Sequence, residues 1–482
     1  MDYEGQFVLT KHDVEVGEHW RSLSFGKWIF RYHPMLRVQK IVSGQDDHLI
    51  GCISGFFYPD QDTDTVTLQD VDEAAFESYV YAQPGHFIAI YAGADTPHVY
   101  LDPSGSLPVV YSEKYEGVAS SPGLFLGEDY DKDFNKELYQ SMGMPEIDFW
   151  YPGTITPHFS VKRLLPNHYL EVDSWKSYRH WPKPDSLEKT KTNGELVAVI
   201  NEQIKQSLLG ASEQRQLCLA LTAGRDSRCL LSAAGDLDIL DKLSCYTFTD
   251  RIKGIDEIIA QKITSDHHLD WKLLPLIKAN KQQSRDWLKK VGHAVSGPIM
   301  KNHMALSILK DREILVQGSA AQVGRAFYLK KSDQVAPRFT TQSLLNLLKL
   351  PQVEEFHQSC AEWLEEVETY DLFVQLDLLS IEIRLGCWGG PQVNGNLLFG
   401  PVLYPLSNRK IFNAMMQLDR DYRVQQKLMQ DMIKLNWPEL MKYPFNQHKG
   451  WQHINEFMYK VSLVPGFIRK RMKLLKHMDD PN

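Results

Sequence analysis

The sequence lacks the features that mark several classes of protein. Its six cysteines in 482 residues include no C-x-x-C pair, which argues against a structural zinc site and fits a reducing compartment. The formal net charge of −8 leaves no basic excess for nonspecific binding of nucleic acid. No apolar run approaches the roughly 20 residues of a membrane-spanning helix, and residues 1–13 show no signal-peptide pattern. We therefore expect a soluble cytoplasmic protein with no transmembrane segment and no nucleic-acid partner.

The composition that is present is typical of a globular protein. Hydrophobic residues make up 43% and charged residues 24%, and the length predicts two or three domains of about 150 residues each. Residues 1–173 contain short apolar stretches separated by turn signals, such as 86–91 and 98–101, and this spacing predicts a β-rich domain of two sheet layers. Residues 174–192 are polar and charged and contain two prolines, so we predict a linker there.

A different pattern begins at residue 193. Apolar residues recur at every fourth position from Leu196 to Leu208, which indicates one face of a helix. Farther along, short apolar strands alternate with helices, and this order predicts a parallel sheet. The chain from about residue 341 is expected to be mainly helical. The strands are expected at residues 217–221, 243–248, 271–276 and 314–317.

The segment with the clearest chemistry is LCLALTAGRDSRCLL, residues 217–231. A continuous apolar run, as in a buried strand, meets small and polar residues and then an apolar helix. The backbone N–H groups at the start of such a helix form a ready site for an anion at the end of the strand. Ala223 and Gly224 would let a phosphate approach the backbone closely.

Polar side chains in this loop add to the prediction of a phosphate site. Thr222 and Ser227 can donate hydroxyl hydrogen bonds. Asp226 would repel a bare phosphate, so it is predicted to act with a cation or as a charge at the helix N-terminus. The loop contains no lysine, so it is not a Walker phosphate loop. By itself, the segment fits an ordinary strand–turn–helix connection equally well.

Several collinear segments together resemble one family. Residues 222–227, TAGRDS, resemble the Ser-Gly-Gly-x-Asp-Ser loop of the ATP-pyrophosphatases, and residues 256–268 resemble the Asp-Glu and His-His segment of their asparagine synthetase-like branch. Upstream, residues 100–111 resemble that branch's Arg-Asp-x-x-Gly-x-x-Pro-Leu-Tyr-Tyr hairpin, and residues 161–169 its Ile-x-x-Leu-x-Pro-Gly-His segment. The family includes asparagine synthetases, β-lactam synthetases and lasso-peptide cyclases.

The resemblance implies a mixed α/β and α+β fold. Residues 1–173 would form an inactive glutaminase-like β-sandwich of the Ntn type, residues 174–192 the linker, and residues 193–482 a synthetase domain with a parallel sheet and a helical C-terminal portion. The implied cofactors are ATP and Mg²⁺, with Mg²⁺ held by Asp226 and the residue at position 322. The residues implied to bind ATP are Leu221, Thr222, Ala223, Gly224, Arg225, Asp226, Ser227, Tyr246, Thr247, Phe248 and Gly318.

Departures from the family pattern limit what the resemblance implies. Asp2 stands where glutamine-using members have a nucleophilic cysteine, so we predict no glutaminase activity. Gln322 stands where an acid is expected, and its amide oxygen can ligate Mg²⁺ but adds no negative charge. Arg325 either binds phosphate or a substrate carboxylate in the site or is a surface charge, and the sequence leaves both open. Lys449 lies about where relatives place a catalytic lysine, although a surface lysine is the simpler interpretation of so short a motif.

Other residues invite a functional interpretation. Arg384 and Arg409 sit in apolar surroundings, which suggests charge pairing or substrate contact rather than plain solvation. Adjacent His267 and His268 would point to opposite faces of a strand, so we expect loop hydrogen bonds and not a metal site. The basic run at residues 469–476 fits either a solvated helix end or contact with a partner.

The function implied by the resemblance is that of an AMP-forming carbon–nitrogen ligase in a biosynthetic pathway. A small-molecule or peptide carboxylate would attack the α-phosphate of ATP, and an amine would then displace AMP to form an amide. Asp2 and Gln322 favour the alternative, an ATP-binding pseudoenzyme that acts as a regulator or scaffold. A third possibility, thiolation of RNA, is disfavoured by the lack of a basic excess and of a reactive cysteine pair. A homodimer or a protein partner is left open.

Overall fold

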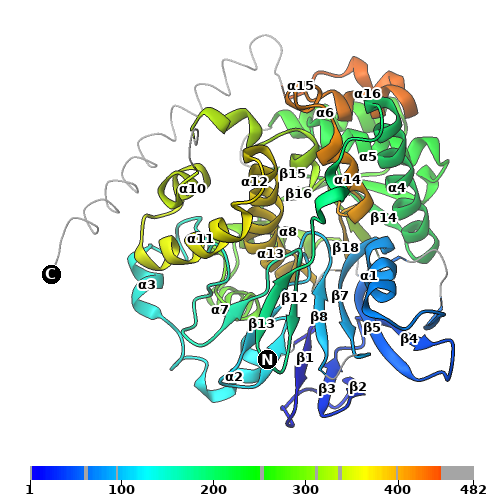
Figure 1. Cartoon of the computed structure of the whole chain (residues 1–482). Helices are drawn as coiled ribbons and strands as arrows, with labels where there is room; N and C mark the ends of the chain where they lie inside the picture. Colours follow the sequence, from blue (N-terminus) through cyan, green and yellow to red (C-terminus); the bar gives the residue numbers. More distant parts are fainter. Residues whose placement is uncertain are drawn as a thin grey trace.

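Two sheets, mainly antiparallel, make up the N-terminal half of the chain (Figure 1). The computed structural model describes residues 3–58, 63–93, 96–249, 254–309, 313–334, 339–397 and 400–446. The first sheet has the order β11-β9-β10-β1-β3-β2, and the second has the order β13-β12-β8-β7-β5-β4-β6. Their strands are β1 (Phe7–Thr10), β2 (Arg21–Phe25), β3 (Trp28–Tyr32), β4 (Arg37–Ser43), β5 (Leu49–Phe57), β6 (Thr65–Leu68), β7 (Gly85–Tyr91), β8 (His98–Leu101), β9 (Val110–Ser112), β10 (Gly117–Ala119), β11 (Lys162–Arg163), β12 (His168–Glu171) and β13 (Lys176–Arg179).

The two sheets pack face to face across a shared apolar core. Phe7 of β1 and Ile88 of β7 belong to this core, whereas their neighbours Val8 and Phe87 point to the outer faces. This alternation is the period-2 arrangement of side chains along a strand, and because both faces of β7 are covered, its sequence reads as a continuous apolar run. A helix covers the outer face of each sheet. These helices are α1 (Glu73–Ala82) on the second sheet and α2 (Gly123–Leu126) on the first.

Residues 174–192 are not a simple linker. Their first part is β13, which pairs antiparallel with β12 at the edge of the second sheet. Its side chains alternate between exposed and half-buried positions. A polar edge strand of this kind has the same composition as a linker, which is why composition alone missed it. The later part includes the 3-10 turn η2 (Pro184–Leu187), where the carbonyl of Ser186 accepts a hydrogen bond from Gln417 of the C-terminal half.

A five-stranded parallel sheet organises the second half of the chain, which confirms the predicted mixed α/β class. Leu217 and Leu219 of the central strand face a core shared with flanking helices, and Cys218 between them faces the core of the N-terminal sheets. The sequence predicts all of its strands but β18, which is two residues long. The order is β16 (Trp271–Pro275), β15 (Leu243–Thr249), β14 (Leu217–Ala220), β17 (Ile314–Val316) and β18 (Val402–Leu403).

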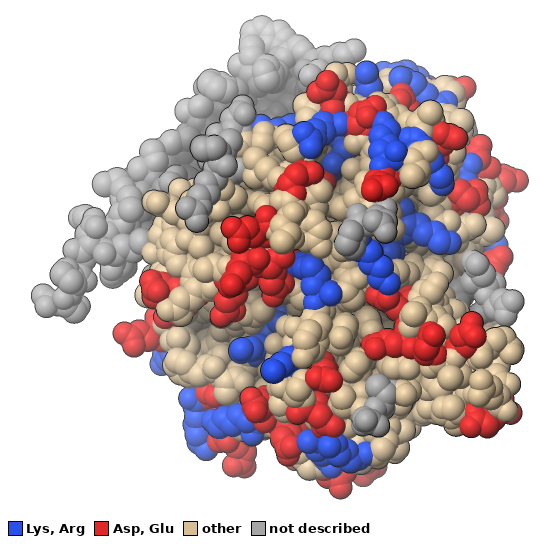
Figure 2. Space-filling model, in the orientation of Figure 1, with Lys and Arg blue, Asp and Glu red and all other residues tan. Residues whose placement is uncertain are grey.

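Helices surround this sheet and continue to the end of the described chain (Figure 1). None of the helices in the described ranges is long and apolar enough to cross a bilayer. On the face of the described residues shown in Figure 2, basic and acidic side chains are interspersed. The helices that matter below are α4 (Asn193–Gln214), α5 (Arg225–Asp236), α6 (Ile255–Asp266), α7 (Lys281–Lys290), α8 (Met300–Leu306), α9 (Ala321–Gly324), α11 (Glu354–Val367), the π-helix η6 (Leu379–Gly389), α13 (Gly390–Asn396) and α14 (Arg409–Gln417).

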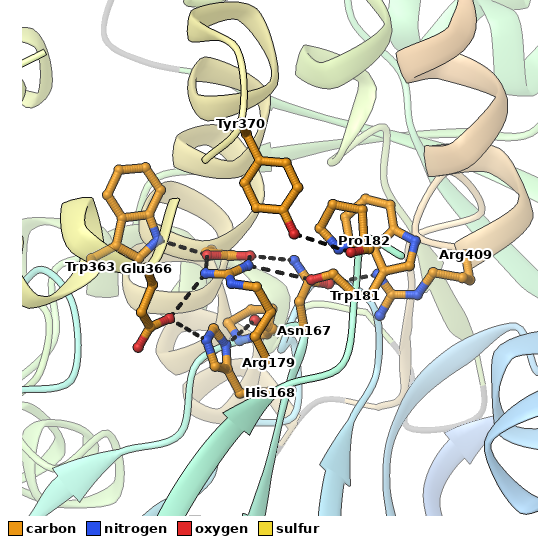
Figure 3. Close-up of polar contacts among 11 residues, drawn as sticks. Asn167, His168, Arg179, Trp181, Pro182, Trp363, Glu366, Tyr370 and Arg409 are labelled. Atoms are coloured by element: carbon orange, nitrogen blue, oxygen red, sulfur yellow. Dashed lines mark hydrogen bonds and ion pairs between the residues drawn. The ribbon is translucent and has the colours of Figure 1, made fainter. Parts of the chain in front are cut away.

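A buried polar network joins the second sheet to the helices of the C-terminal half (Figure 3). Its centre is Glu382 of η6, whose carboxylate is fully buried. Arg179 of β13 donates to it from both terminal nitrogens, one of them at 2.9 Å. Asn167 and Trp363 each donate at 2.7 Å. The network therefore ties an edge strand of the N-terminal half to two helices of the other half.

Arg409 completes this joint from α14. Its guanidinium is buried and donates to Oδ1 of Asn167 at 2.6 Å. It also lies over the ring of Trp181, 4.5 Å from the centroid (Figure 3). The apolar surroundings of Arg409 suggested charge pairing or substrate contact, and its contacts among the described residues are instead with a neutral amide and aromatic rings.

Candidate nucleotide-binding site

The predicted phosphate loop lies at the carboxyl end of β14, in the middle of the parallel sheet. Gly224 is the N-cap of α5 and has extended backbone angles, so the chain turns directly from strand to helix. A cavity of about 460 Å³ opens beside this turn. Open α/β sheets bind ligands in the crevice at this edge. Eight of the predicted site residues line the cavity, namely Thr222, Asp226, Ser227, Tyr246, Phe248, Gly318, Gln322 and Arg325.

The loop is ordered by hydrogen bonds within the protein. The Thr222 N–H donates to Oγ of Ser227 at 3.1 Å, and the Gly224 N–H donates to Oγ1 of Thr222 at 3.1 Å. The Ala223 N–H donates to Oδ1 of Asp256, in the first turn of α6, at 2.8 Å. These three N–H groups of the loop are therefore engaged within the protein, and they precede α5, whose first N–H groups are the ones that the sequence predicts as the anion site. The Thr222 and Ser227 side chains remain at the cavity wall.

Arg228 holds the carbonyl side of the same loop, and sequence reasoning missed it. Its buried guanidinium donates to the carbonyls of Ala223 at 2.5 Å, Tyr443 at 2.8 Å and Pro444 at 2.7 Å. Burial lowers the pKa of Arg228 to about 10, so the side chain stays charged at neutral pH. The only hint in the sequence was an arginine directly before the apolar run Cys229–Leu231 of the predicted helix. Arg228 thus clamps the loop to the segment that follows the last described helical turn.

The predicted ATP contacts on β15, the strand next to the loop, point to two different faces of the sheet. Tyr246 and Phe248 line the cavity, and the Tyr246 hydroxyl accepts a hydrogen bond from Gln317 at 2.9 Å. Thr247 points away, as alternation along a strand requires, and donates to the carbonyl of Leu221 at 2.8 Å. The side chains of Thr247 and Leu221 are buried in the protein and do not line this cavity.

Other predicted residues also lie away from the cavity. Arg225 points outward from α5, where it donates to Gln426 and lies 4.7 Å from the ring centroid of Phe445. Ala223 and Gly224 contribute backbone to the loop but are not among the residues that line the cavity. Lys449 lies outside the described residues.

The cation beside Asp226 is an arginine. The Arg325 guanidinium, just past α9, lies 3.3 Å from the Asp226 carboxylate, and the two side chains are 35% and 20% exposed. Burial raises the pKa of Asp226, and the charges of Arg325 and Arg225 oppose that rise. Gly318 packs closely on the Asp226 side of this pair, since a Cβ at that position would lie 3.0 Å from Cβ of Asp226. The sequence left the role of Arg325 open, and the structure places it in the cavity wall.

The donor set at this point does not fit a magnesium site with two carboxylates. Of the two predicted ligands, Asp226 is paired with Arg325, and Gln322 offers a neutral amide oxygen. Within the described ranges, no cluster of three or more histidine, cysteine, aspartate or glutamate side chains could hold a metal ion. We therefore derive no chemical step through a metal ion.

The opposite wall of the cavity is formed by η6 and α13, which lie outside the motifs that resemble the family. Arg384 and Trp388 project from η6, and Gln392 and Asn396 from α13. Arg384 lies over the ring of Trp388, 4.8 Å from its centroid. The apolar surroundings of Arg384 in the sequence were the only signal of this wall.

Comparisons with known proteins add little to this geometry. No protein-family model matches the sequence, and no curated protein matches it. Among solved structures, the chain has a likeness to the glutamine-dependent NAD+ synthetase from Acinetobacter baumannii in complex with ADP, with a TM-score of 0.18 and 9% sequence identity. The match spans about half of each protein, 51% of this chain and 51% of that one. A likeness at this level carries no argument about function.

Proposed function

We propose that the chain binds ATP in the cavity at the end of β14 and uses it to activate a carboxylate, as an AMP-forming carbon–nitrogen ligase that does not hydrolyse glutamine. One observation carries the proposal. The loop that resembles the ATP-pyrophosphatase motif and the aromatic side chains of the neighbouring strand line one cavity at the carboxyl edge of a parallel sheet. At about 460 Å³, the cavity is also within the usual size of small-ligand sites.

Side chains in the wall of the cavity can stabilise the negative charges of such a reaction. Thr222 and Ser227 offer hydroxyl groups, and Arg325 offers a guanidinium, to the pyrophosphate that leaves. A substrate carboxylate oxygen would attack the α-phosphorus as the bond to pyrophosphate breaks. An amine would then attack the acyl carbon, AMP would leave, and the amine would lose a proton. Arg384, on the opposite wall, offers a second guanidinium to the phosphates of ATP.

The test is to identify the nucleotide product. The purified chain is incubated with α-labelled ATP, Mg²⁺ and pools of small-molecule or peptide carboxylates and amines, and the nucleotides are resolved. We expect AMP with pyrophosphate, and a loss of at least about tenfold in Ser227→Ala because the loop loses an oxyanion donor. Ser141→Ala, at an exposed helix end, is the matched control. Accumulation of ADP would discard the assignment.

A second candidate is an ATP-binding protein without turnover, acting as a regulator or scaffold. It is favoured by the ion pair between Asp226 and Arg325 and by Gln322 in place of an acid. ATP binding without conversion in any substrate pool would support it. Gln322→Asp then separates the two candidates: a gain in turnover indicates a weakened ligase, and no change indicates a chain adapted to binding.

A further inference from the structure

Arg325 is held where it can contact both Asp226 and a ligand. One terminal nitrogen of the guanidinium, Nη2, lies 3.3 Å from Oδ2 of the Asp226 carboxylate. The buried Nε–H of Arg325 has no hydrogen-bond partner among the described residues. An arginine carries five N–H donors in a planar fork that matches the oxygens of a phosphate. The side chain therefore keeps donors available in the wall of the cavity.

The charges around the cavity favour an anion. Among the described residues that line it, the side chains charged at neutral pH are Asp226, Arg325 and Arg384. One carboxylate and two guanidinium groups leave a net charge of +1. No carboxylate of the described chain forms an ion pair with Arg384, which lies against aromatic rings.

A divalent cation that bound to Asp226 would have to displace the Arg325 guanidinium from this carboxylate. A metal ion bound to Asp226 would lie beside the Arg325 guanidinium, and the two positive charges would repel each other. Gln322 provides no negative charge to offset this repulsion. The usual function of the metal, which is to neutralise the phosphates of ATP, can be supplied by the two arginines instead.

We propose that Arg325, supported by Arg384, takes the place of a magnesium ion, so that the cavity binds the polyphosphate chain of ATP without a divalent metal. The inference rests on the proposed function in one respect, which is that ATP is the ligand of this cavity. It differs from the family pattern because the positive charge is built into the protein.

The test is calorimetric titration of the full chain with ATP in EDTA and in excess Mg²⁺. We expect dissociation constants within about threefold of each other in the two conditions, because the protein supplies the charge. Arg325→Gln should weaken binding in EDTA by about 10- to 100-fold, since a charge-assisted contact is lost. Arg325→Lys, which keeps the charge but not the fork, should lose less. Arg285→Gln, an exposed arginine on α7, is the matched control.

A double variant tests the exchange between arginine and metal directly. Gln322→Asp with Arg325→Gln restores the acid and removes the built-in cation, and we expect its ATP binding to depend on Mg²⁺ by at least about tenfold. Wild-type binding that is more than about tenfold tighter in Mg²⁺, or an Arg325→Gln variant equal to the Arg285→Gln control, would overturn the inference alone. Absence of wild-type ATP binding in both conditions would overturn the proposed function and the inference with it. Circular dichroism and thermal unfolding confirm that each variant is folded.

Discussion

Replacing Glu382 with glutamine tests the joint between the two halves of the chain. Among the described residues, the hydrogen bonds to this carboxylate come from donors on Arg179, Asn167 and Trp363. A glutamine amide has nearly the same shape, but its NH₂ group would face at least one of these donors. The buried Arg179 guanidinium would also lose the charge that it faces. Both effects act on the folded state and lower its stability.

The size of the loss follows from the local charges. Burial by itself raises the pKa of Glu382, but the charge and hydrogen bonds of Arg179 outweigh it, so the pKa lies below its ordinary value and the group is ionised. Removing one partner of a buried ion pair costs about 3–5 kcal/mol. Arg179 keeps an ion pair with the more exposed Glu366 at 3.2 Å, so we expect about 3 kcal/mol, near the lower limit.

Urea unfolding followed by tryptophan fluorescence measures this loss. For an m value of about 3 kcal/mol/M, the midpoint of the Glu382→Gln variant should fall by about 1 M. The matched control is Glu365→Gln, an exposed glutamate on α11, which should change stability by less than about 0.5 kcal/mol. If the two variants unfold at the same urea concentration, the buried pair does not hold the halves together and the reasoning is wrong.

The remaining predictions concern the cavity, pH and glutamine. Gly318→Ala presses a methyl group against the first turn of α5, so it should cost about 1–3 kcal/mol of stability and weaken ATP binding, whereas Gly194→Ala, exposed in the first turn of α4, should do neither. Burial lowers the pKa of His86 from 6.5 to about 4, so the unfolded chain takes up the proton first. Wild-type stability relative to His86→Gln should therefore fall by up to about 3 kcal/mol as the pH drops from 6.5 towards 4, and a pH-independent difference in urea midpoint would contradict this. Asp2 is no thiol nucleophile, so glutamate release from glutamine should not exceed that of a heat-inactivated control.

The sequence by itself determined the local elements of the site. Short apolar stretches between turn signals identified strands such as β7 and β8, whose two faces both pack against apolar layers. An apolar run followed by small and polar residues identified the turn from β14 into α5. These signals are readable because their periods and caps lie within a few neighbouring residues. Six of the eight predicted residues that line the cavity lie on or next to such elements, whereas Gln322 and Arg325, on and after α9, were located by the family resemblance.

Only the tertiary structure decided which charges meet. Arg325 pairs with Asp226 from 99 positions away, and Arg179 pairs with Glu382 across 203 positions. Sequence patterns give the type of each residue but not its partner, because the partner is set by the order of strands and the packing of helices around them. For the same reason, the polar composition of residues 174–192 predicts a linker, whereas the pairing with β12 makes residues 176–179 the edge strand β13. Arg384 lines the cavity because η6 packs beside the end of the parallel sheet. The sequence does not predict this position, since no local pattern distinguishes a pocket wall from a buried helix.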